Sequence, residues 1–227
     1  MNLSIADNLA HVQAHIEAAC QAAGRPVGSV RLLAVSKTWG PEAVRAAHAA
    51  GQTAFGENYI QEAVDKIQAL QDLPLEWHCI GPIQSNKTRL VAEHFDWVHS
   101  VDRLKIAQRL SEQRPAHLPP LQVCIQVNVD GGETKSGVAP QDLPALAQAV
   151  AALPRLQLRG LMTIPEPAET DEQMRAVHAQ AKALFDSLRA QGLPLDTLSM
   201  GMSADLAAAI AEGSTMVRVG TAIFGKR

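Results

Sequence analysis

Short apolar runs alternate with segments of helical periodicity along almost the whole chain. Each apolar run is nearly continuous and is bounded by turn residues, which is typical of strands buried on both faces of a parallel sheet. Eight such runs lie at residues 30–35, 52–55, 76–80, 96–101, 121–129, 156–163, 196–200 and 215–219. The pattern therefore predicts a parallel sheet covered by helices.

Helical patterns precede the first strand and separate the later ones. The opening helix places Leu3, Leu9, Val12, Ile16 and Ala19 on one side. Further helices are expected at residues 41–50, 57–70, 85–93, 103–113, 140–153, 170–191 and 203–211. Eight strands with interleaved helices in 227 residues favour a closed (β/α)8 barrel, the TIM barrel, over an open doubly wound sheet. The chain contains no linker and no change of composition, so we expect a single α/β domain over residues 1–227, with an extra N-terminal helix.

Composition narrows the classes of partner. The formal net charge of -3 gives no general attraction to nucleic acid or to anionic membranes. The three cysteines, Cys20, Cys79 and Cys124, lie far apart, which argues against a disulfide framework and against a zinc site. The N-terminal segment carries charged residues that a signal peptide lacks, and no apolar stretch approaches the roughly 20 residues of a membrane helix. We expect a cytoplasmic monomer that binds neither nucleic acid nor membranes.

Lys37 is the first residue whose position suggests chemistry. It closes the first apolar run, two residues after Val35, and precedes a helix that opens with Pro41. An alkylammonium held toward a low-dielectric interior loses proton affinity, and a neutral amine is a nucleophile toward carbonyls. The alternative is a lysine that extends from the strand end into water, which is the commoner fate of a single lysine in this position.

Two glycine turns lie at strand ends where this type of barrel often binds phosphate. In (β/α)8 barrels the chemistry gathers at the carboxyl ends of the strands, and phosphate often binds near the seventh and eighth. The seventh strand runs into Gly201 and a candidate helix cap, Ser203, while the eighth runs into Gly220 and Thr221. Either turn alone fits an ordinary helix start. Together they predict a phosphate site opposite Lys37.

Three other motifs carry less weight. Residues 220–226 match the first positions of a P-loop, but Arg227 replaces the Ser or Thr that would hold magnesium. His11 and His15 lie four apart without further ligands at metal-site spacing, so we expect no metal. Lys135 lies in a glycine-rich loop after the fifth strand, where it could meet a substrate carboxylate or a second anion, or remain hydrated.

Two polar segments, 55–59 and 77–87, reach the same mouth of the predicted barrel. Their amide and aromatic side chains could contact a ligand there. They could equally begin the helices that follow, with Asn58 and Ser85 serving the first turns. The sequence leaves both roles open.

Taken together, these segments resemble a known family. The motifs are Ala-Val-Ser-Lys at 34–37, Phe-Gly-Glu-Asn at 55–58, Trp-His at 77–78 with the segment to 87, Gly-Leu-Met-Thr at 160–163, Leu-Ser-Met-Gly-Met-Ser-Ala-Asp at 198–205, Arg-Val-Gly-Thr at 218–221 and Phe-Gly at 224–225. In this order they are similar to the pyridoxal phosphate homeostasis protein family, single-domain proteins that bind pyridoxal 5'-phosphate (PLP). They also resemble the N-terminal barrel of alanine racemase, a PLP enzyme of fold type III.

The resemblance implies roles for nine positions. Lys37 would form the internal aldimine, the covalent link to PLP, and Arg218 would face the pyridine nitrogen. Burial of Lys37 beside Arg218 would favour the neutral amine. Asn58 would lie near the ring, with His78 and Met200 around the cofactor. The positions implied to hold the phosphate, by side chain or backbone amide, are Met202, Ser203, Gly220 and Thr221.

Arg218 would favour carriage of PLP over its use in catalysis. Arginine is practically always protonated, so it can donate a hydrogen bond to the ring nitrogen but cannot help that nitrogen hold a proton. PLP acts as a strong electron sink chiefly when the ring nitrogen is protonated. The resemblance therefore implies a non-enzymatic protein that holds PLP on Lys37, acts in vitamin B6 homeostasis and passes the cofactor to apo-enzymes.

The alternative is a PLP-dependent amino-acid racemase. Racemisation needs a proton donor and a proton acceptor on opposite faces of the substrate. In the racemases the face opposite the lysine is served by a tyrosine from a second domain. This chain ends after the eighth strand, and its only tyrosine is Tyr59. We therefore expect that the protein is not an enzyme.

Overall fold

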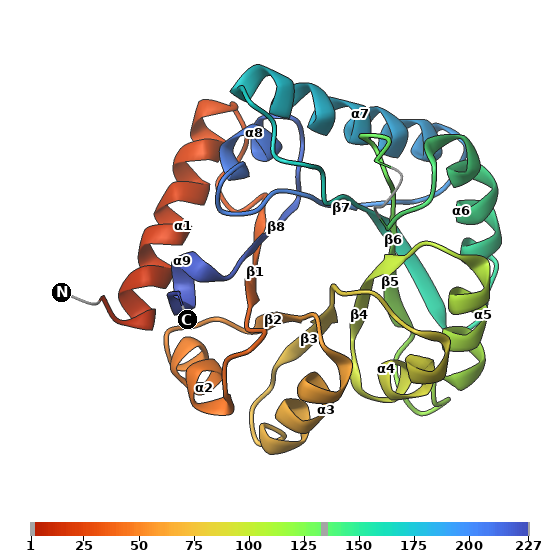
Figure 1. The fold of residues 1–227 in the computed structure, drawn as a ribbon, viewed down its shortest axis with the longest axis horizontal. Coiled ribbons are helices and arrows are strands. Elements are labelled where there is room, and N and C mark those ends of the chain that lie inside the picture. Colours follow the sequence, from red (N-terminus) through yellow and green to blue (C-terminus); the bar gives the residue numbers. More distant parts are fainter. Residues whose placement is uncertain (1–2, 133–135, 227) are drawn as a thin grey trace.

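The eight predicted strands form a closed parallel barrel (Figure 1). The computed structural model describes residues 3–132 and 136–226. Each strand pairs with the next in sequence, and β8 pairs with β1, so the predicted (β/α)8 barrel is confirmed. The strands are β1 (Arg31–Val35), β2 (Ala54–Glu57), β3 (Glu76–Cys79), β4 (Trp97–Val101), β5 (Leu121–Gln126), β6 (Leu156–Met162), β7 (Thr197–Ser199) and β8 (Met216–Val219).

Helices surround the barrel on its outer face (Figure 1). One of them, α1 (Ile5–Ala22), precedes the first strand and lies against α8 and α9. The others are α2 (Pro41–Ala49), α3 (Ile60–Ala69), α4 (Thr88–His94), α5 (Leu104–Gln113), α6 (Leu143–Ala151), α7 (Asp171–Ala190), α8 (Leu206–Ala211) and α9 (Thr221–Phe224), with the 3-10 turns η1 (Ser85–Lys87) and η2 (Pro140–Asp142).

Element boundaries differ from the predictions at the ends that matter for the site. Glu57, expected to start a helix, is the last residue of β2, and α3 begins only at Ile60. The helix after β7 begins at Leu206 with Asp205 as its N-cap, so the prediction that Ser203 caps it is wrong. The short helix α9 was not predicted, because four residues are too few to show a helical period.

The opening helix buries most of the side that the sequence predicted. Leu9, Val12 and Ile16 are buried, whereas Leu3 precedes the helix and is 52% exposed. The side chain of Ser4 accepts a hydrogen bond from the amide of Asp7 at 3.1 Å and so caps the first turn. The helix therefore begins at its cap and covers the barrel near β8 and β1 (Figure 1).

Polar side chains lie inside the barrel. Every residue of β2, β4, β7 and β8 is buried, as expected for strands covered on both faces. His99 on β4 nevertheless lies 2.9 Å from the hydroxyl of Ser199 on β7. These strands are not neighbours in the barrel, so their side chains meet across its interior. The interior is therefore not a purely apolar core.

Two features that the described residues lack bear on function. No helix in the described part of the chain is long and apolar enough to cross a membrane. Within the same residues no group of His, Cys, Asp and Glu side chains could hold a metal ion. His11 and His15 lie exposed on α1, and all three cysteines are buried as free thiols.

Candidate functional site

Most of the predicted site residues lie at the carboxyl ends of the strands. In the sheet, Leu33 of β1 pairs with Arg218 of β8, and Val35 pairs with Gly56 of β2. The register brings the ends of β8, β1 and β2 together, and with them the segments that carry Gly220, Lys37 and Asn58. A cavity of about 360 Å³ opens at this end of the barrel. Its lining includes Gly201 and most residues of the segment 164–171, and of the nine predicted site residues it contains Met202 and Arg218.

Arg218 is a buried cation in the lining of this cavity. Its side chain is 3% exposed and donates to Ser199 Oγ and to the Thr163 carbonyl, both at 2.7 Å. Burial lowers the pKa of Arg218 to about 10, so the guanidinium is still charged at neutral pH. Among the described residues no carboxylate forms an ion pair with it. Since a guanidinium carries five N–H donors, several remain for a ligand.

Several polar atoms at this end of the barrel are buried without a hydrogen-bond partner among the described residues, and Oε2 of Glu57 in the ion pair with Lys66 is among them. Two others concern the predicted ligand. One is Oγ1 of Thr163, whose carbonyl already accepts from Arg218, and the other is Oδ1 of Asn58. A buried polar atom without a partner costs about 1–3 kcal/mol. Thr163 contacts Arg218 through its carbonyl, so an unpartnered hydroxyl oxygen and unused guanidinium donors belong to neighbouring residues, which fits a polar ligand that brings its own donors and acceptors.

The role of Asn58 as a helix start is not supported. The helix α3 begins at Ile60, its N-cap is Tyr59, and no side chain caps it through a hydrogen bond. Gln84, which precedes η1, likewise makes no side-chain cap bond, and Ser85 accepts only through its carbonyl, from Thr88 and Arg109. The amide of Asn58 is therefore free of helix capping.

The turn after β7 is shaped by Gly201. Its φ of +101° is rarely adopted by other residues, and a Cβ there would lie 2.6 Å from Cβ of Ala209. Beyond it, the amide of Met202 donates to Asp205 Oδ1 at 2.8 Å, and Asp205 Oδ2 lies 2.8 Å from His178 Nε2. The Met202 amide is therefore engaged within the turn.

The charge on Asp205 follows from these contacts. Burial alone would raise its pKa, but the hydrogen bonds from His178 and the Met202 amide outweigh burial and hold the pKa below its ordinary value. A carboxylate thus lies directly beneath the turn predicted to hold phosphate. Ser203 is exposed at this turn and makes no hydrogen bond with its hydroxyl to the described residues.

The turn after β8 meets the end of β1. Gly220 is the N-cap of α9, and a Cβ added there would lie 3.1 Å from the Val35 carbonyl. Thr221 opens α9 and is exposed. The two glycine turns predicted from the sequence therefore both lie at the barrel mouth, and their predicted contacts with phosphate stay predictions.

Lys37 is exposed, so the expectation that burial favours its neutral amine is not met. The buried lysine at this end of the barrel is Lys66 on α3, which is 4% exposed. Its ammonium forms an ion pair with Glu57 and donates to the Ser36 carbonyl at 2.9 Å. Ser36 also donates through its hydroxyl to Glu57 Oε1 at 3.0 Å. The residue before Lys37 is therefore fixed from both its carbonyl and its side chain.

The residue after Lys37 is fixed to the same cluster. The amide of Thr38, whose φ is +68°, donates to Glu62 Oε1 at 2.6 Å, and Glu62 also pairs with Lys66 at 3.3 Å. Burial raises the pKa of Glu57, and the charge of Lys66 opposes that rise. The backbone of Lys37 is thus anchored on both sides while its amine reaches solvent.

Sequence reasoning missed this anchoring cluster. The only available signal was Glu62 and Lys66, four residues apart on one predicted helix. That spacing is common on exposed helix faces, so it gave no reason to expect a buried pair. Glu57 was hidden in the same way, because it was assigned to a helix start.

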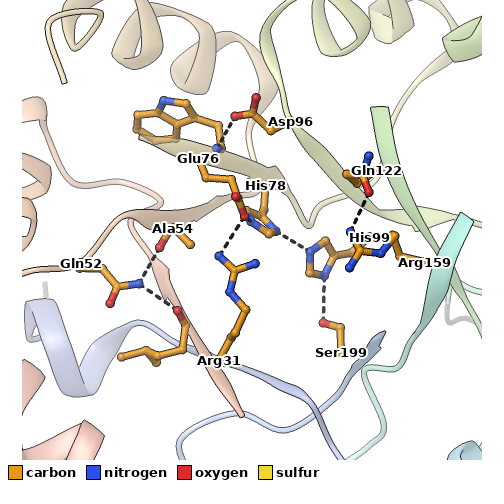
Figure 2. A network of polar contacts seen from close by, with 12 residues as sticks. Arg31, Gln52, Ala54, Glu76, His78, Asp96, His99, Gln122, Arg159 and Ser199 are labelled. Carbon is orange, nitrogen blue, oxygen red and sulfur yellow. Dashed lines mark hydrogen bonds and ion pairs between the residues drawn. The ribbon is translucent and has the colours of Figure 1, made fainter. Parts of the chain in front are cut away.

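Met200 and His78 lie deeper than the mouth. Met200 is fully buried in the main apolar cluster, while Met202 next to the cavity is 49% exposed. His78 is fully buried, and its two ring nitrogens lie 2.8 Å from His99 Nε2 and 2.7 Å from Glu76 Oε1 (Figure 2). Its predicted contact with a cofactor stays a prediction. Lys135 lies outside the described residues.

The chain has clear relatives. The family model "Alanine racemase, N-terminal domain" matches residues 8–227. The pyridoxal phosphate homeostasis protein of Pseudomonas aeruginosa is 65% identical over 224 residues, which cover 99% of this chain and 96% of the relative. The protein of the same name from Escherichia coli K12 is 56% identical over 226 residues, covering 98% and 97%.

Solved structures give the same grouping. PipY of Synechococcus elongatus PCC7942, with PLP bound, is 41% identical and covers 98% of this chain and 100% of its own, with a TM-score of 0.86. Alanine racemase of Corynebacterium glutamicum shares the fold, with 21% identity, a TM-score of 0.71 and coverage of 98% of this chain and 61% of its own. This chain therefore belongs to the pyridoxal phosphate homeostasis protein family, whose barrel is that of the alanine racemase N-terminal domain.

Proposed function

We propose that this protein binds PLP at the carboxyl end of the barrel, holds it covalently on Lys37, and serves as a non-catalytic PLP carrier in vitamin B6 homeostasis. The observation that carries the proposal is Arg218, a buried cation that lines the cavity and has donors left over. PLP supplies an aldehyde that reacts with amines and a ring that withdraws electrons when its nitrogen is protonated. The PLP bound to PipY supports this choice of ligand.

In this proposal, different residues at the barrel mouth bind different parts of PLP. Arg218 donates to the ring nitrogen, and Asn58 offers its unpartnered amide oxygen to the polar edge of the ring. Ser203 and Thr221 provide exposed hydroxyls for the phosphate on the two glycine turns. Lys37 carries its amine on a backbone that is fixed on both sides, so this amine would be held in a defined place for the aldehyde of PLP.

Arg218 also argues against turnover. A cation that donates to the ring nitrogen leaves that nitrogen unprotonated, which weakens the ring as an electron sink. A second proton-transfer group opposite Lys37 would also be required for racemisation. Tyr59, the only tyrosine of the chain, is 55% exposed at the start of α3. We therefore favour storage and delivery of PLP over amino-acid racemisation.

Binding is tested with matched lysine variants. Purified wild-type protein loaded with PLP should keep the visible absorption of a lysine-bound cofactor after gel filtration. Lys37→Ala should lose it, and Lys105→Ala, a change of an exposed lysine on α5, should keep it. Retention of the band by Lys37→Ala would overturn the assignment of Lys37.

Delivery is tested separately from binding. An apo-PLP enzyme is mixed with loaded protein or with the same concentration of free PLP, and recovery of its activity is followed. We expect faster recovery with the loaded protein, together with no interconversion of alanine enantiomers above free PLP. Equal recovery would remove the delivery role, and racemisation at even about 1 per second would favour an enzyme.

A further inference from the structure

A chain of hydrogen-bonded side chains runs through the barrel from Arg218 to the opposite end. Arg218 Nη1 donates to Ser199 Oγ at 2.7 Å, and Ser199 Oγ lies 2.9 Å from His99 Nδ1. His99 Nε2 then lies 2.8 Å from His78 Nδ1, and His78 Nε2 lies 2.7 Å from Glu76 Oε1. Figure 2 shows the part of this chain from Glu76 to Ser199.

The two end residues of this hydrogen-bond network, Glu76 and Arg218, lie at opposite ends of the barrel. Glu76 is the first residue of β3, at the amino-terminal end, where Arg31 of β1 pairs with it at 3.0 Å. Arg218 lies near the carboxyl end of β8 and lines the cavity. The three residues between them are fully buried: His78, His99 and Ser199.

The carboxylate fixes the direction of every hydrogen bond in the chain. The hydrogen bond from His78, with Arg31 beside it, lowers the pKa of Glu76 to about 2, so Glu76 is a carboxylate that can only accept. His78 Nε2 must therefore carry a hydrogen. Burial lowers the pKa of His78, so the ring is neutral and its Nδ1 is an acceptor.

The same reasoning continues to Ser199. His99 Nε2 must donate to the acceptor on His78, and burial lowers the pKa of His99 well below its ordinary value, so His99 Nδ1 is also an acceptor. The hydroxyl hydrogen of Ser199 then points to His99, and its oxygen faces Arg218. A guanidinium can only donate, so this is the orientation that Arg218 requires.

The shared direction of these hydrogen bonds links the charge of Arg218 to that of Glu76. All four hydrogen bonds point the same way, from the cation to the carboxylate, and aligned bonds of this kind polarise one another. No described carboxylate pairs with Arg218 directly, so Glu76 is the acidic group to which its hydrogen bonds lead. A buried arginine held in this way has one preferred position for the donors that face the cavity.

We propose that Glu76 is a positioning residue for PLP, which sets the Arg218 guanidinium against the ring nitrogen through His78, His99 and Ser199. The proposal rests on the proposed PLP site. It assigns a role in cofactor binding to a residue at the far end of the barrel from Lys37.

The first test needs no variant and no PLP. Nitrogen NMR of the whole chain with 15N-labelled histidine distinguishes the two neutral ring forms. We expect both His78 and His99 to carry hydrogen on Nε2 and none on Nδ1. Hydrogen on Nδ1 of either ring, or a doubly protonated ring at neutral pH, would overturn the chain of donors. This result stands whether or not PLP binds.

The second test compares two changes of carboxylate to amide at the same end of the barrel. Glu76→Gln removes the charge and keeps an oxygen acceptor for His78. Asp196→Asn does the same to a carboxylate that pairs with Arg159 at 2.7 Å and makes no hydrogen bond to any of the three linking residues. The readouts are the dissociation constant of PLP and the 15N chemical shift of its labelled ring nitrogen.

We expect Glu76→Gln to weaken PLP binding about threefold to tenfold and to shift the ring-nitrogen signal, because a weaker chain holds Arg218 less firmly. Asp196→Asn should leave both readouts unchanged. Equal effects from the two variants, or none from either, would overturn the proposal. If wild-type protein fails to bind PLP while the histidine forms are as expected, the proposed function fails and the geometry of the chain survives.

Discussion

Two buried cations, Lys66 on α3 and Arg218 on β8, differ in how far the protein uses their N–H donors. Lys66 contacts the carboxylate of Glu57 and has partners for all three of its N–H donors, in Glu57, Ser36 and Glu62. Arg218 uses two donor groups in hydrogen bonds to the protein and has no carboxylate in contact among the described residues. Lys66, whose N–H donors all have protein partners, stabilises the fold. Arg218, which has unused donors beside a cavity, can bind a ligand.

The comparison also explains how the mouth is organised. Lys66 fixes the segment that carries Lys37, so the reactive amine is exposed but its backbone is anchored. Arg218 is buried, and in the proposed site it would fix the ring end of the ligand. One end of PLP would thus meet a rigid buried group and the other an accessible amine, which suits a protein that must both hold and release the cofactor.

The largest expected effect is a loss of stability when Lys66 is removed. Lys66→Met leaves Glu57 buried beside an apolar side chain, and breaking a buried pair in this way costs about 3–5 kcal/mol of unfolding free energy. Urea unfolding measures this cost, with Lys105→Met as the exposed control. The double variant Lys66→Met with Glu57→Gln should recover part of the loss. A cost no larger than that of the control would contradict the structural role of Lys66.

Removing Arg218 should instead weaken the binding of PLP. Arg218→Gln should weaken PLP binding about 10- to 100-fold, since hydrogen bonds to charged groups contribute about 1.5–3 kcal/mol. Its effect on unfolding free energy should be smaller than that of Lys66→Met. The matched control is Arg114→Gln, which removes a buried arginine that donates three hydrogen bonds to backbone carbonyls and does not line the cavity.

For Arg114→Gln we expect lower stability with unchanged PLP affinity in the folded protein. The measurement is a PLP titration followed by absorbance, together with urea unfolding. If Arg218→Gln binds PLP as tightly as wild type, the unused donors of Arg218 do not contribute to PLP binding.

The turn that supports Arg218 gives an intermediate effect. The Gly201 carbonyl accepts from the Arg218 amide at 3.0 Å, and a Cβ at this positive-φ position would collide with Ala209. Gly201→Ala should cost about 2–3 kcal/mol and weaken PLP binding. Gly192→Ala, at a φ of +97° with nothing within 4 Å of the added Cβ, carries the backbone strain alone and should cost about 1 kcal/mol. Equal costs would show that the packing around Gly201 is loose.

The smallest effect is expected from acid. The pKa of Glu76 falls from its ordinary 4.5 to about 2 in the folded chain, first because His78 donates to it and then because Arg31 lies close. Between these values the unfolded chain binds the proton and the folded chain does not. The stability that ionised Glu76 contributes is therefore present above about pH 4.5 and is lost as the pH falls toward 2.

Glu76→Gln should flatten this acid limb of the stability curve, as measured by thermal unfolding over that pH range. Glu93→Gln, at an exposed position on α4, serves as the control and should leave the curve unchanged. An acid limb of the same steepness in Glu76→Gln and wild type would mean that the carboxylate gains nothing from His78.

The fold could be predicted from the sequence because a strand that is buried on both faces is a run of apolar residues that can be recognised locally. Apolar runs such as 32–35, separated by helical periods, are sufficient to predict a closed parallel barrel. The same pattern located the mouth, since strand ends are marked by residues such as Gly201 and Gly220. Boundaries failed where a polar residue belongs to a strand end, as Glu57 does.

The chemistry of the barrel interior could not be predicted in the same way. His78, His99 and Ser199 come from three strands that are separated in sequence, and each looks like an ordinary polar residue in an apolar run. Strand periodicity can assign a side chain to one face of the sheet, but not to a partner across the barrel. The sequence left Lys37 open between a buried amine and one that extends into water. It could not decide for a related reason, because the buried positions nearby belong to Lys66 and Glu57, which the fold brings to this strand end.

The most direct test of the central claim is to map the site of attachment. Wild-type protein is loaded with PLP, treated with borohydride to make any bond to an amine permanent, digested and examined by peptide mass spectrometry. The account predicts one dominant modified peptide, carrying the label on Lys37, and loss of that label in Lys37→Ala but not in Lys105→Ala. A dominant label on any other lysine, or the same yield of label in Lys37→Ala, would contradict it.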